Sequence, residues 1–475
     1  MCGFIFAKTK SKITQSALLN AEKFLKQRGP DARSILRLED QVGSSVLLVH
    51  YLLDISGDAI QQPYFESHSQ ELILLFNGEI YNYRSLIPAS SDTTAILPLF
   101  RDYTGRLCEE LSGEFNIAIY NKLKNCLDIF TDPFLTKPLF IGRSNDPSEL
   151  GVATYQSALI SLGFNSVFSV QPNTHYHIVF NEGSISITER FPIFRFSTSQ
   201  FRQSFSDWSE CFIESVRRRA SHGAFTPLVC LSSGYDSGAI TQALNVLELP
   251  YHTFSIRAGE NESILAARVK RNQKFCLSHT ELPGLTKAGS RRISSMIANE
   301  VEPFIYAHKD SNLTQLSLAE DQGALGAFAI AELAHKAGMK VAISGCGADE
   351  IVSDYGSSGR KIYPHSEFGG LFPASLSNGF FPWKKFYGDT QRSYLFKDEI
   401  IFGHHGIEGR YPFLDRDVVQ AFLHLDPDLK NLEYKAPIAN FLREQEYPFE
   451  PERKRGFSPR VDPFLRRLRK RLGIV

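Results

Sequence analysis

Short apolar runs separated by Gly, Pro, Asn and Asp recur through roughly the first 190 residues. Runs of this length between turn-forming residues are typical of strands in packed antiparallel sheets. A helical pattern covers residues 15–27 and stops before Arg28-Gly29-Pro30. This half of the chain therefore predicts packed antiparallel sheets with flanking helices. The clearest strand-like runs are residues 45–49, 71–76, 115–120 and 176–180.

Beyond residue 207 the pattern changes, because strand-like and helical stretches now alternate. Such alternation predicts a parallel sheet covered by helices. Residues 191–207 are rich in Phe, Arg and Ser and have no clear period, so we expect a linker there. Since 475 residues are too many for one ordinary core, we predict domains at 1–190 and 208–475. The second domain shows strand-like runs at 227–231, 252–256 and 339–343, and helical stretches at 237–247 and 324–338.

Composition narrows the class of protein. Lys+Arg and Asp+Glu are both 52, so no overall field favours nucleic acid or a membrane surface. The basic stretch from Arg453 to Arg471 is then better explained as a solvated helix face. No apolar run approaches the ~20 residues of a membrane span, and no secretory signal is visible. Seven scattered cysteines without a CxxC pair predict reduced thiols, a cytoplasmic location and no structural zinc.

The second residue is a candidate nucleophile. Methionine before a small residue is normally removed, so we expect the mature chain to begin with Cys2. Its thiol could attack a substrate, and its own α-amine, with a pKa of ~7.7–8.0, could accept a proton. A chance cysteine is the simpler explanation if residue 2 is considered alone.

Two loops of the second domain are candidate phosphate and metal ligands. Residues 229–237 read as a strand, a Ser/Gly turn and a helix start, which suits pyrophosphate, with Asp236 placed for Mg²⁺. An ordinary loop with a Ser N-cap would look the same. Residues 341–350 repeat the pattern and end in Asp349-Glu350. Since carboxyl ends of parallel strands share one sheet edge, we expect Asp236 and Asp349 to face each other.

Taken in order, these motifs resemble the asparagine synthetase family. That resemblance implies a class II glutamine amidotransferase domain of Ntn-type αββα fold, joined to a parallel-sheet α/β ATP pyrophosphatase domain. Single motifs are weak, because Asn77-Gly78 is also a common hairpin turn and a lone Lys435 would ordinarily be a surface lysine. The ordered set carries the resemblance: Cys2-Gly3, 28–31, 77–82, Ser91-Asp92, 132–133, 137–140, 232–237, 347–350, 408–415, Lys435 and 453–458.

The resemblance implies a division of labour. Cys2 would attack the glutamine side chain and release ammonia, with Asn77 and the Gly78 N–H as an oxyanion hole, and Glu79 and Asp92 on the α-amine. Ammonia would pass through an interdomain channel to a carboxylate that ATP has adenylated. Lys435 would stabilise the developing charge, with Mg²⁺ on Asp236 and Asp349. The implied ATP and pyrophosphate contacts are Leu231, Ser232, Ser233, Gly234, Asp236, Ser237, Ile256, Gly345 and Gly347.

Three positions depart from the family pattern. Tyr51 stands where an arginine usually grips the glutamine α-carboxylate, so either Arg33 or Arg37 replaces it or glutamine binds weakly. Cys346 stands where asparagine synthetases have a glutamate and β-lactam-forming relatives a tyrosine. A thiol is a poor base, which favours a carboxylate other than free aspartate, although a small residue in a tight loop explains Cys346 equally well. Ser233 replaces a glycine, a mild change.

Three hypotheses remain at this point. The leading one is a glutamine-dependent, ATP-consuming, Mg²⁺-requiring amide ligase whose partners are glutamine and a carboxylic acid; a homodimer is compatible with it. The second keeps the ligase but uses a substrate amine, with a vestigial glutaminase. The third, a non-catalytic scaffold, is disfavoured by Asp236, Asp349, Glu350 and Lys435. Residues 355–386, rich in Gly, Ser and Phe, could form a lid.

Overall fold

The computed structural model describes residues 2–40, 43–55, 59–67, 69–307, 315–377, 379–451 and 459. The chain forms two compact units. Unit 1 comprises Met1–Arg195 together with two short later segments, His222–Ala224 and Gly403–Gly406. Unit 2 comprises Phe196–Ser221, Phe225–Phe402 and Ile407–Val475. The predicted segment 453–458 lies outside the described residues.

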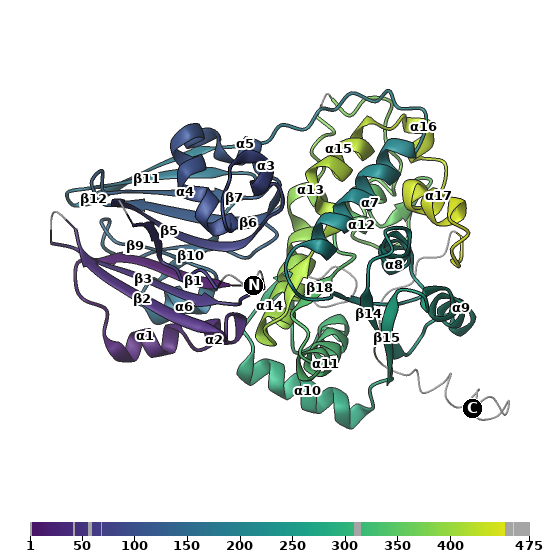
Figure 1. Cartoon of the computed structure of the whole chain (residues 1–475), viewed down its shortest axis with the longest axis horizontal. Coiled ribbons are helices and arrows are strands. Elements are labelled where there is room, and N and C mark those ends of the chain that lie inside the picture. The colour runs from purple at the N-terminus through teal and green to yellow at the C-terminus, as the bar shows by residue number, and fades with distance from the viewer. Residues whose placement is uncertain are drawn as a thin grey trace. The chain divides into compact units, whose positions relative to one another are not determined.

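Unit 1 is built on two antiparallel sheets, each six-stranded within the described residues (Figure 1). β1 and β3 are buried at every position, as expected for strands covered on both faces. The first sheet has the order β10 (Ser166–Ser169), β8 (Phe140–Arg143), β9 (Leu150–Ala153), β1 (Gly3–Thr9), β3 (Ser45–Leu52), β2 (Ala32–Glu39). The second has the order β12 (Ser184–Arg190), β11 (His175–Asn181), β7 (Cys126–Thr131), β6 (Gly113–Asn121), β5 (Ser69–Ile80), β4 (Tyr64–Glu66).

Helices cover both sheets of unit 1, which confirms the predicted αββα architecture (Figure 1). The helix predicted over residues 15–27 is broken in two, and each part buries a leucine, Leu18 or Leu25. The first sheet carries α1 (Gln15–Ala21), α2 (Leu25–Arg28) and α6 (Gln156–Ser161). The second carries α3 (Tyr83–Leu86), α4 (Asp92–Tyr103), the 3-10 turn η1 (Thr104–Arg106) and α5 (Leu107–Glu110).

Unit 2 contains the predicted parallel sheet. Its order is β15 (Cys276–Pro283), β14 (Tyr251–Arg257), β13 (Leu228–Cys230), β18 (Val341–Ile343), β21 (Glu408–Arg410), and every pairing is parallel. The chain leaves β13 toward β14 on one side and returns as β18 on the other. The carboxyl ends of β13 and β18 therefore form a topological switch point, where ligands bind in open α/β sheets.

Helices surround this sheet, and two small hairpins accompany them. The helices are α7 (Ser206–Ser221), α8 (Tyr235–Val246), α9 (Glu262–Asn272), α10 (Lys287–Glu300), α11 (Gln322–Lys336), α12 (Ala348–Val352), α13 (Lys384–Tyr387), α14 (Asp389–His404), α15 (Arg416–His424), α16 (Pro427–Lys430), α17 (Ala436–Glu444) and the 3-10 turn η2 (Pro412–Leu414). The hairpins are β16 (Ile305–Ala307) with β17 (Gln315–Ser317), and β19 (Gly356–Ser357) with β20 (Arg360–Lys361).

The segment considered as a lid is packed over part of its described length. The rings of Phe368, Phe372, Phe380 and Trp383 form a cluster in which Phe368 and Phe380 lie 5.0 Å apart between centroids. None of the seven cysteines, all in the described part of the chain, forms a disulfide. Every helix among the described residues is too short or too polar to span a bilayer.

Candidate active site

Cys2 lies immediately before β1, and a buried arginine donates a hydrogen bond to its backbone carbonyl oxygen. Arg28, at the end of α2, donates from Nε to the Cys2 carbonyl oxygen at 3.0 Å and from Nη1 to the Tyr155 hydroxyl at 3.1 Å. Gly29 follows because a Cβ there would collide with the Tyr51 carbonyl group. The Arg28-Gly29 motif thus fixes the position of residue 2 and leaves its side chain partly exposed.

Asn77 and Gly78 lie inside β5 and do not form a hairpin turn. Gly78 has a φ of 136°, and a Cβ there would come within 1.9 Å of the Glu114 carbonyl oxygen. Asn77 is fully buried, yet neither atom of its side-chain amide has a hydrogen-bond partner among the described residues. Unsatisfied buried amides are rare and costly, so this one is available to a bound ligand.

Asp92 lies beside Glu79 and is the first residue of helix α4. Ser91 caps α4 in a capping box, which sets Asp92 at the first turn, where its Oδ2 accepts from the Ile80 N–H at 3.1 Å. Burial and the Glu79 charge raise the Asp92 pKa to about 7, and His222 partly opposes them. The His222 imidazole lies 2.6 Å from Glu79 Oε2 and packs edge-on against Tyr81.

Tyr51 has an arginine beside it. Arg33 pairs with Tyr51 across β2 and β3, and its Nε donates to the Tyr51 hydroxyl at 3.1 Å. The same guanidinium binds Glu22 at 2.9 Å. Arg37 is instead paired with Leu47, further along the strands. Of the two predicted substitutes for the missing arginine, Arg33 is therefore the one adjacent to Tyr51.

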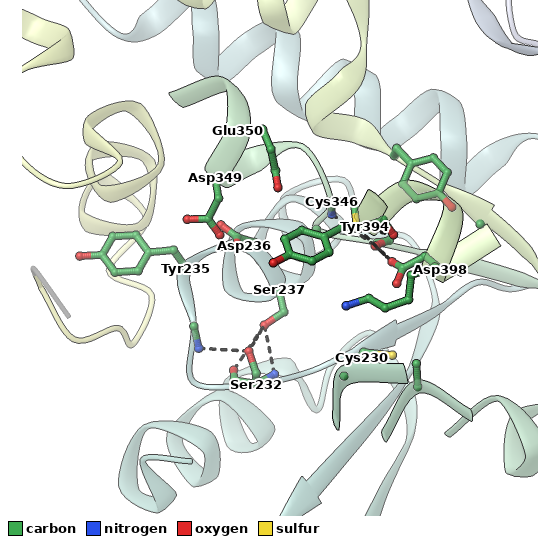
Figure 2. Close-up of a pocket in the computed structure, with 18 of the residues that line it drawn as sticks. Cys230, Ser232, Tyr235, Asp236, Ser237, Cys346, Asp349, Glu350, Tyr394 and Asp398 are labelled. Atoms are coloured by element: carbon green, nitrogen blue, oxygen red, sulfur yellow. Dashed lines mark hydrogen bonds between the residues drawn. The ribbon is translucent and has the colours of Figure 1, made fainter. Parts of the chain in front are cut away.

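The loop between β13 and α8 is shaped by its own serines and by a buried arginine. Ser237 Oγ accepts from the Ser232 N–H at 3.0 Å, and Ser232 Oγ accepts from the Gly234 N–H at 3.1 Å (Figure 2). Arg268 of α9 donates to the carbonyls of Ser232 and Gly234 at 2.6 and 2.7 Å. Gly238 permits this, since a Cβ there would meet the guanidinium at 2.5 Å.

This loop already binds an anion. The Glu260 carboxylate accepts from the Ser233 N–H at 2.6 Å and also from the Ser233 hydroxyl. The N–H groups of residues 232–234 are thus bonded to Ser237, to the Glu260 carboxylate and to Ser232.

The loop after β18 approaches the first one closely. Gly345 is required there, because a Cβ would lie 2.7 Å from the Asp236 Cβ. The loop is anchored by Ser344, whose N–H donates to the Arg410 carbonyl at 2.8 Å. Gly347, with φ of 94°, then starts α12 and turns Asp349 toward Asp236 (Figure 2).

Lys435 lies between the two aspartates. Its Nζ is 2.5 Å from Asp236 Oδ1 and 3.1 Å from Asp349 Oδ1, and the Tyr434 hydroxyl donates to Asp349 at 2.9 Å. Burial alone would lower the Lys435 pKa, but the two carboxylates raise it. The residue adopts a left-handed backbone conformation that costs about 1 kcal/mol or more for a non-glycine residue. In this conformation, at the start of α17, the ammonium contacts an aspartate of each loop.

A cavity of about 590 Å³ opens beside this cluster. Among the predicted residues, Ser232, Gly234, Asp236, Ser237, Gly345, Cys346, Asp349 and Lys435 line it. Leu231, Ser233, Ile256 and Gly347 do not; Leu231 and Ile256 are buried in the sheet region. The rest of the wall is rich in tyrosine and carboxylate side chains, including Tyr306, Tyr394, Glu350 and Asp398.

Cys346 donates a hydrogen bond within this cavity. Its Sγ lies 3.1 Å from Asp398 Oδ2, and the Ser344 hydroxyl donates to the same oxygen at 2.8 Å (Figure 2). Burial and the Asp398 charge raise the pKa of the Cys346 thiol well above its ordinary value. Burial likewise raises the Asp398 pKa. The thiol is thus a proton donor at neutral pH, and the carboxylate is the basic group.

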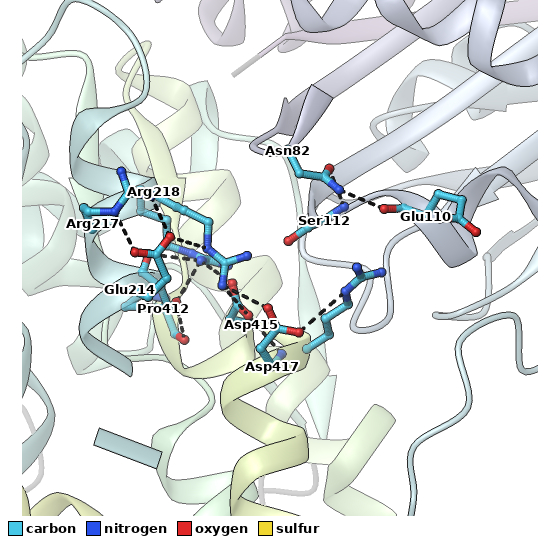
Figure 3. Close-up of polar contacts among 12 residues, drawn as sticks. Asn82, Glu110, Ser112, Glu214, Arg217, Arg218, Pro412, Asp415 and Asp417 are labelled. Carbon is cyan, nitrogen blue, oxygen red and sulfur yellow. Dashed lines mark hydrogen bonds and ion pairs between the residues drawn. The ribbon is translucent and has the colours of Figure 1, made fainter. Parts of the chain in front are cut away.

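The 408–415 motif has a structural role in unit 2. Arg410 is fully buried and pairs with Glu408 at 2.8 Å, so the 408–415 motif supports the Ser344 loop through β21. Its last residue, Asp415, binds Arg219 at 2.8 Å, and Arg218 reaches Asp417 at 3.0 Å (Figure 3).

In unit 1, Asn82 closes the 77–82 motif. It donates to the Glu110 carbonyl oxygen and accepts from the Ser112 N–H, both at 2.8 Å (Figure 3). The end of this motif therefore has a structural role in the turn after β5.

Both units of the chain are similar to known protein families. Residues 1–186 match a family model described as a glutamine amidotransferase domain. Residues 207–384 and 384–471 match the asparagine synthase model, which covers more than half of the chain. The chain belongs to the asparagine synthase family.

Two relatives that match most of the chain support this family assignment. A protein of Acanthamoeba polyphaga mimivirus is 26% identical over 92% of this chain and 80% of its own length. One from Methanocaldococcus jannaschii is 24% identical over 89% of this chain and 80% of its own. Both are provisionally named glutamine-hydrolysing asparagine synthetases. A solved allosteric regulatory enzyme of purine biosynthesis covers 59% of this chain and 80% of its own at 14% identity, but the TM-score of 0.34 is too low for inference.

An asparagine synthase domain implies the use of ATP, and the residues at the switch point fit a metal nucleotide. Asp236 and Asp349 converge on a single cation, Lys435 Nζ. Mg²⁺ is typically bound by one or two carboxylates plus substrate phosphates, so these two side chains would hold it. Its chemistry there would be to offset phosphate charge.

Several residues of the cavity and of the Glu79–Asp92 cluster were not predicted from the sequence. Asp398 lies within α14 and Glu260 in the loop before α9, and neither belongs to a motif used for the resemblance. His222 follows α7, far along the chain from Glu79. No motif or spacing in the sequence links these three residues to the predicted site.

Proposed function

We propose that this protein is a glutamine-dependent, ATP-consuming ligase that converts a substrate carboxylate to an amide, with release of AMP and pyrophosphate. The observation that carries the proposal is the convergence of Lys435, Asp236 and Asp349 beside a large cavity. A carboxylate oxygen of the acceptor attacks the α-phosphorus of ATP, and pyrophosphate leaves. Lys435 neutralises the charge that builds up in this transition state.

Amide formation then takes place in the cavity that the loops after β13 and β18 line. Ammonia attacks the acyl carbon, the bond to AMP breaks, and the extra proton on nitrogen passes to Asp398. Asp398 suits this role because burial raises its pKa, and Ser344 and Cys346 hold its Oδ2 in place. The Cys346 thiol positions this carboxylate.

Glutamine hydrolysis is assigned to unit 1. The Cys2 thiol attacks the side-chain amide carbon, and its proton passes to the Cys2 α-amine. That amine then protonates the leaving nitrogen, so that the C–N bond breaks, ammonia leaves and a glutamyl thioester remains. Water hydrolyses the thioester to glutamate and regenerates the thiol. The Asn77 amide, which has no hydrogen-bond partner among the described residues, and the Gly78 N–H stabilise the oxyanion, which is worth ~3–4 kcal/mol per donor. Glu79 and Asp92 bind the α-ammonium group, and Arg33 beside Tyr51 binds the α-carboxylate in competition with Glu22.

The test is a reaction of the full chain with ATP, Mg²⁺ and glutamine against a panel of carboxylic acids. The proposal expects AMP, pyrophosphate and amide in equal amounts with at least one acid. ADP and phosphate as products, or no acid-dependent turnover with any panel member under conditions where ATP binding is measurable, would contradict it.

A second function is favoured by a specific observation. His222 already contacts Glu79 at 2.6 Å, where the glutamine α-ammonium group would bind, and Tyr51 replaces the expected arginine. Both features favour a ligase that uses a substrate amine and no longer hydrolyses glutamine. Product formation without glutamine or ammonia would support this alternative.

We predict that Asp398→Asn lowers the rate of amide formation by about 100-fold, the ordinary contribution of a general base. Cys346→Ser keeps a donor to Asp398 and should cost less than about tenfold. Rapid-quench measurement of adenylate formation and of amide formation separates the two steps. Adenylate formation should be unchanged in both variants; equal losses in both steps for Asp398→Asn would contradict the assignment.

Glutamine binding should depend on pH. Because the Asp92 pKa is raised to about 7, the carboxyl group is largely neutral at lower pH and attracts an ammonium group weakly. KM for glutamine should therefore fall as the pH rises through about 7. His222 opposes that shift, so His222→Gln should move the midpoint to higher pH. A KM that is constant between about pH 6 and 8 in both proteins would exclude this role for Asp92.

A further inference from the structure

β7 and β11 are neighbouring strands of the second sheet of unit 1 (Figure 1). Four of their side chains with metal-binding donor atoms lie close together. Cys126 and Asp128 alternate along β7, and His175 and His177 alternate along β11. His177 lies directly opposite Asp128 in the antiparallel register, with Cys126 and His175 on either side of that pair. These residues belong to neither of the sites described above.

The donor atoms are close enough to share one ion. Cys126 Sγ, an Asp128 oxygen and a His177 ring nitrogen all lie within 4.8 Å of one another. His177 Nδ1 is 2.8 Å from Asp128 Oδ1, and His175 Nε2 is 2.7 Å from the same oxygen. Zinc is bound by thiolate, imidazole and carboxylate ligands at about 2.0–2.3 Å. Small side-chain rotations would bring three such donors onto one Zn²⁺.

Burial and packing also suit a bound ion. Cys126 and Asp128 are 4% and 7% exposed, whereas the His177 side chain is 43% exposed and gives access from solvent. The His175 ring stacks on Phe130, with centroids 4.2 Å apart, which fixes its orientation. Among the described ion pairs, Asp128 has only the two imidazoles as partners.

The thiol is the donor most affected by its surroundings. The Cys126 thiol is buried, and its sulfur lies within 4.8 Å of an Asp128 oxygen. A thiol that coordinates a divalent ion is deprotonated. Binding at neutral pH would therefore release a proton.

We propose that Cys126, Asp128 and His177 form a zinc-binding site that joins β7 to β11, with His175 as a positioning residue for the carboxylate. The absence of a CxxC pair led the sequence to predict no structural zinc. In a sheet, ligands come from alternate residues of one strand and from the neighbouring strand. A search for CxxC spacing therefore does not detect Cys126, Asp128 and His177. The proposal is independent of glutamine hydrolysis and of adenylation.

The test is titration of the metal-stripped full chain with Co²⁺ alone, without nucleotide or Mg²⁺. One equivalent should produce a sulfur-to-cobalt charge-transfer band. Cys126→Ser should abolish the band. Cys108→Ser, a change at another buried thiol of unit 1, and Cys2→Ala, which removes the thiol next to an α-amine, should leave it intact. No band in the wild type, or a band that survives Cys126→Ser, would overturn the proposal.

A second measurement does not depend on changing a buried residue. Zn²⁺ should raise the Tm of the wild type. His177→Gln alters a half-exposed side chain, so the fold should persist while zinc affinity falls at least about tenfold. His175→Ala, which removes the residue behind the carboxylate, should weaken affinity by about 10–100-fold. Equal zinc affinity of His177→Gln and the wild type would refute the site.

Discussion

Replacing Cys2 by alanine is expected to lower the rate of glutamine-dependent amide formation by about 10,000-fold or more, because the variant lacks the thiol that forms the covalent intermediate. Ammonium salts should restore product formation to near the wild-type rate, since unit 2 is untouched. The measurement is amide yield with glutamine or with ammonium as the nitrogen source.

The matched control is Cys108→Ala, which removes a buried thiol from the same unit and should leave both nitrogen sources usable. Two outcomes would contradict the assignment. If Cys2→Ala still used glutamine, Cys2 would not be the nucleophile. Product formation that requires neither glutamine nor ammonium would instead favour a substrate amine.

Replacing Lys435 by methionine is expected to lower adenylate formation by about 1,000-fold, the scale on which a positioned cation stabilises a transferring phosphoryl group. The loss should fall on kcat more than on KM for ATP, because the charge builds up in the transition state. Asp236 and Asp349 would face each other without the ammonium that now lies between them. The Tm of the variant should therefore be lower than that of the wild type. Mg²⁺ and ATP should restore part of this loss when they are added.

Lys430→Met provides a control for the Lys435 variant. Lys430 is also buried and bonds the Leu423 carbonyl at 2.8 Å, but it does not line the cavity. Its replacement should leave the kinetics of adenylation close to those of the wild type. Adenylation by Lys435→Met within tenfold of the wild-type rate, with a normal Tm for the variant, would contradict the role of this lysine.

The architecture and the convergence of the two acidic loops were predictable because each depends on local patterns combined with a general topological rule. Alternating strands and helices give a parallel sheet, and neighbouring strands bring their loops to one edge. The structure confirms the sheet and brings Asp236 within reach of the Asp349 loop, with Gly345 at their contact.

Other features depend on tertiary packing and were not readable. The Asn77-Gly78 pair permits either a hairpin or a strand, and its pairing with Asn116 and Phe115 of β6 makes it part of a strand. Asp398 gains its significance from burial beside Cys346, a partner distant in sequence. His222 reaches Glu79 only because residues 222–224 fold with unit 1. No spacing rule could have linked these pairs.

Adenylation is the step on which the account depends, and oxygen-18 reports it most directly. An acceptor acid labelled in its carboxylate, incubated with ATP, Mg²⁺ and ammonium, should transfer one labelled oxygen to each AMP, which mass spectrometry detects. Label in inorganic phosphate, or AMP formed without label while amide accumulates, would contradict attack of the carboxylate on the α-phosphorus at the Asp236–Lys435–Asp349 site.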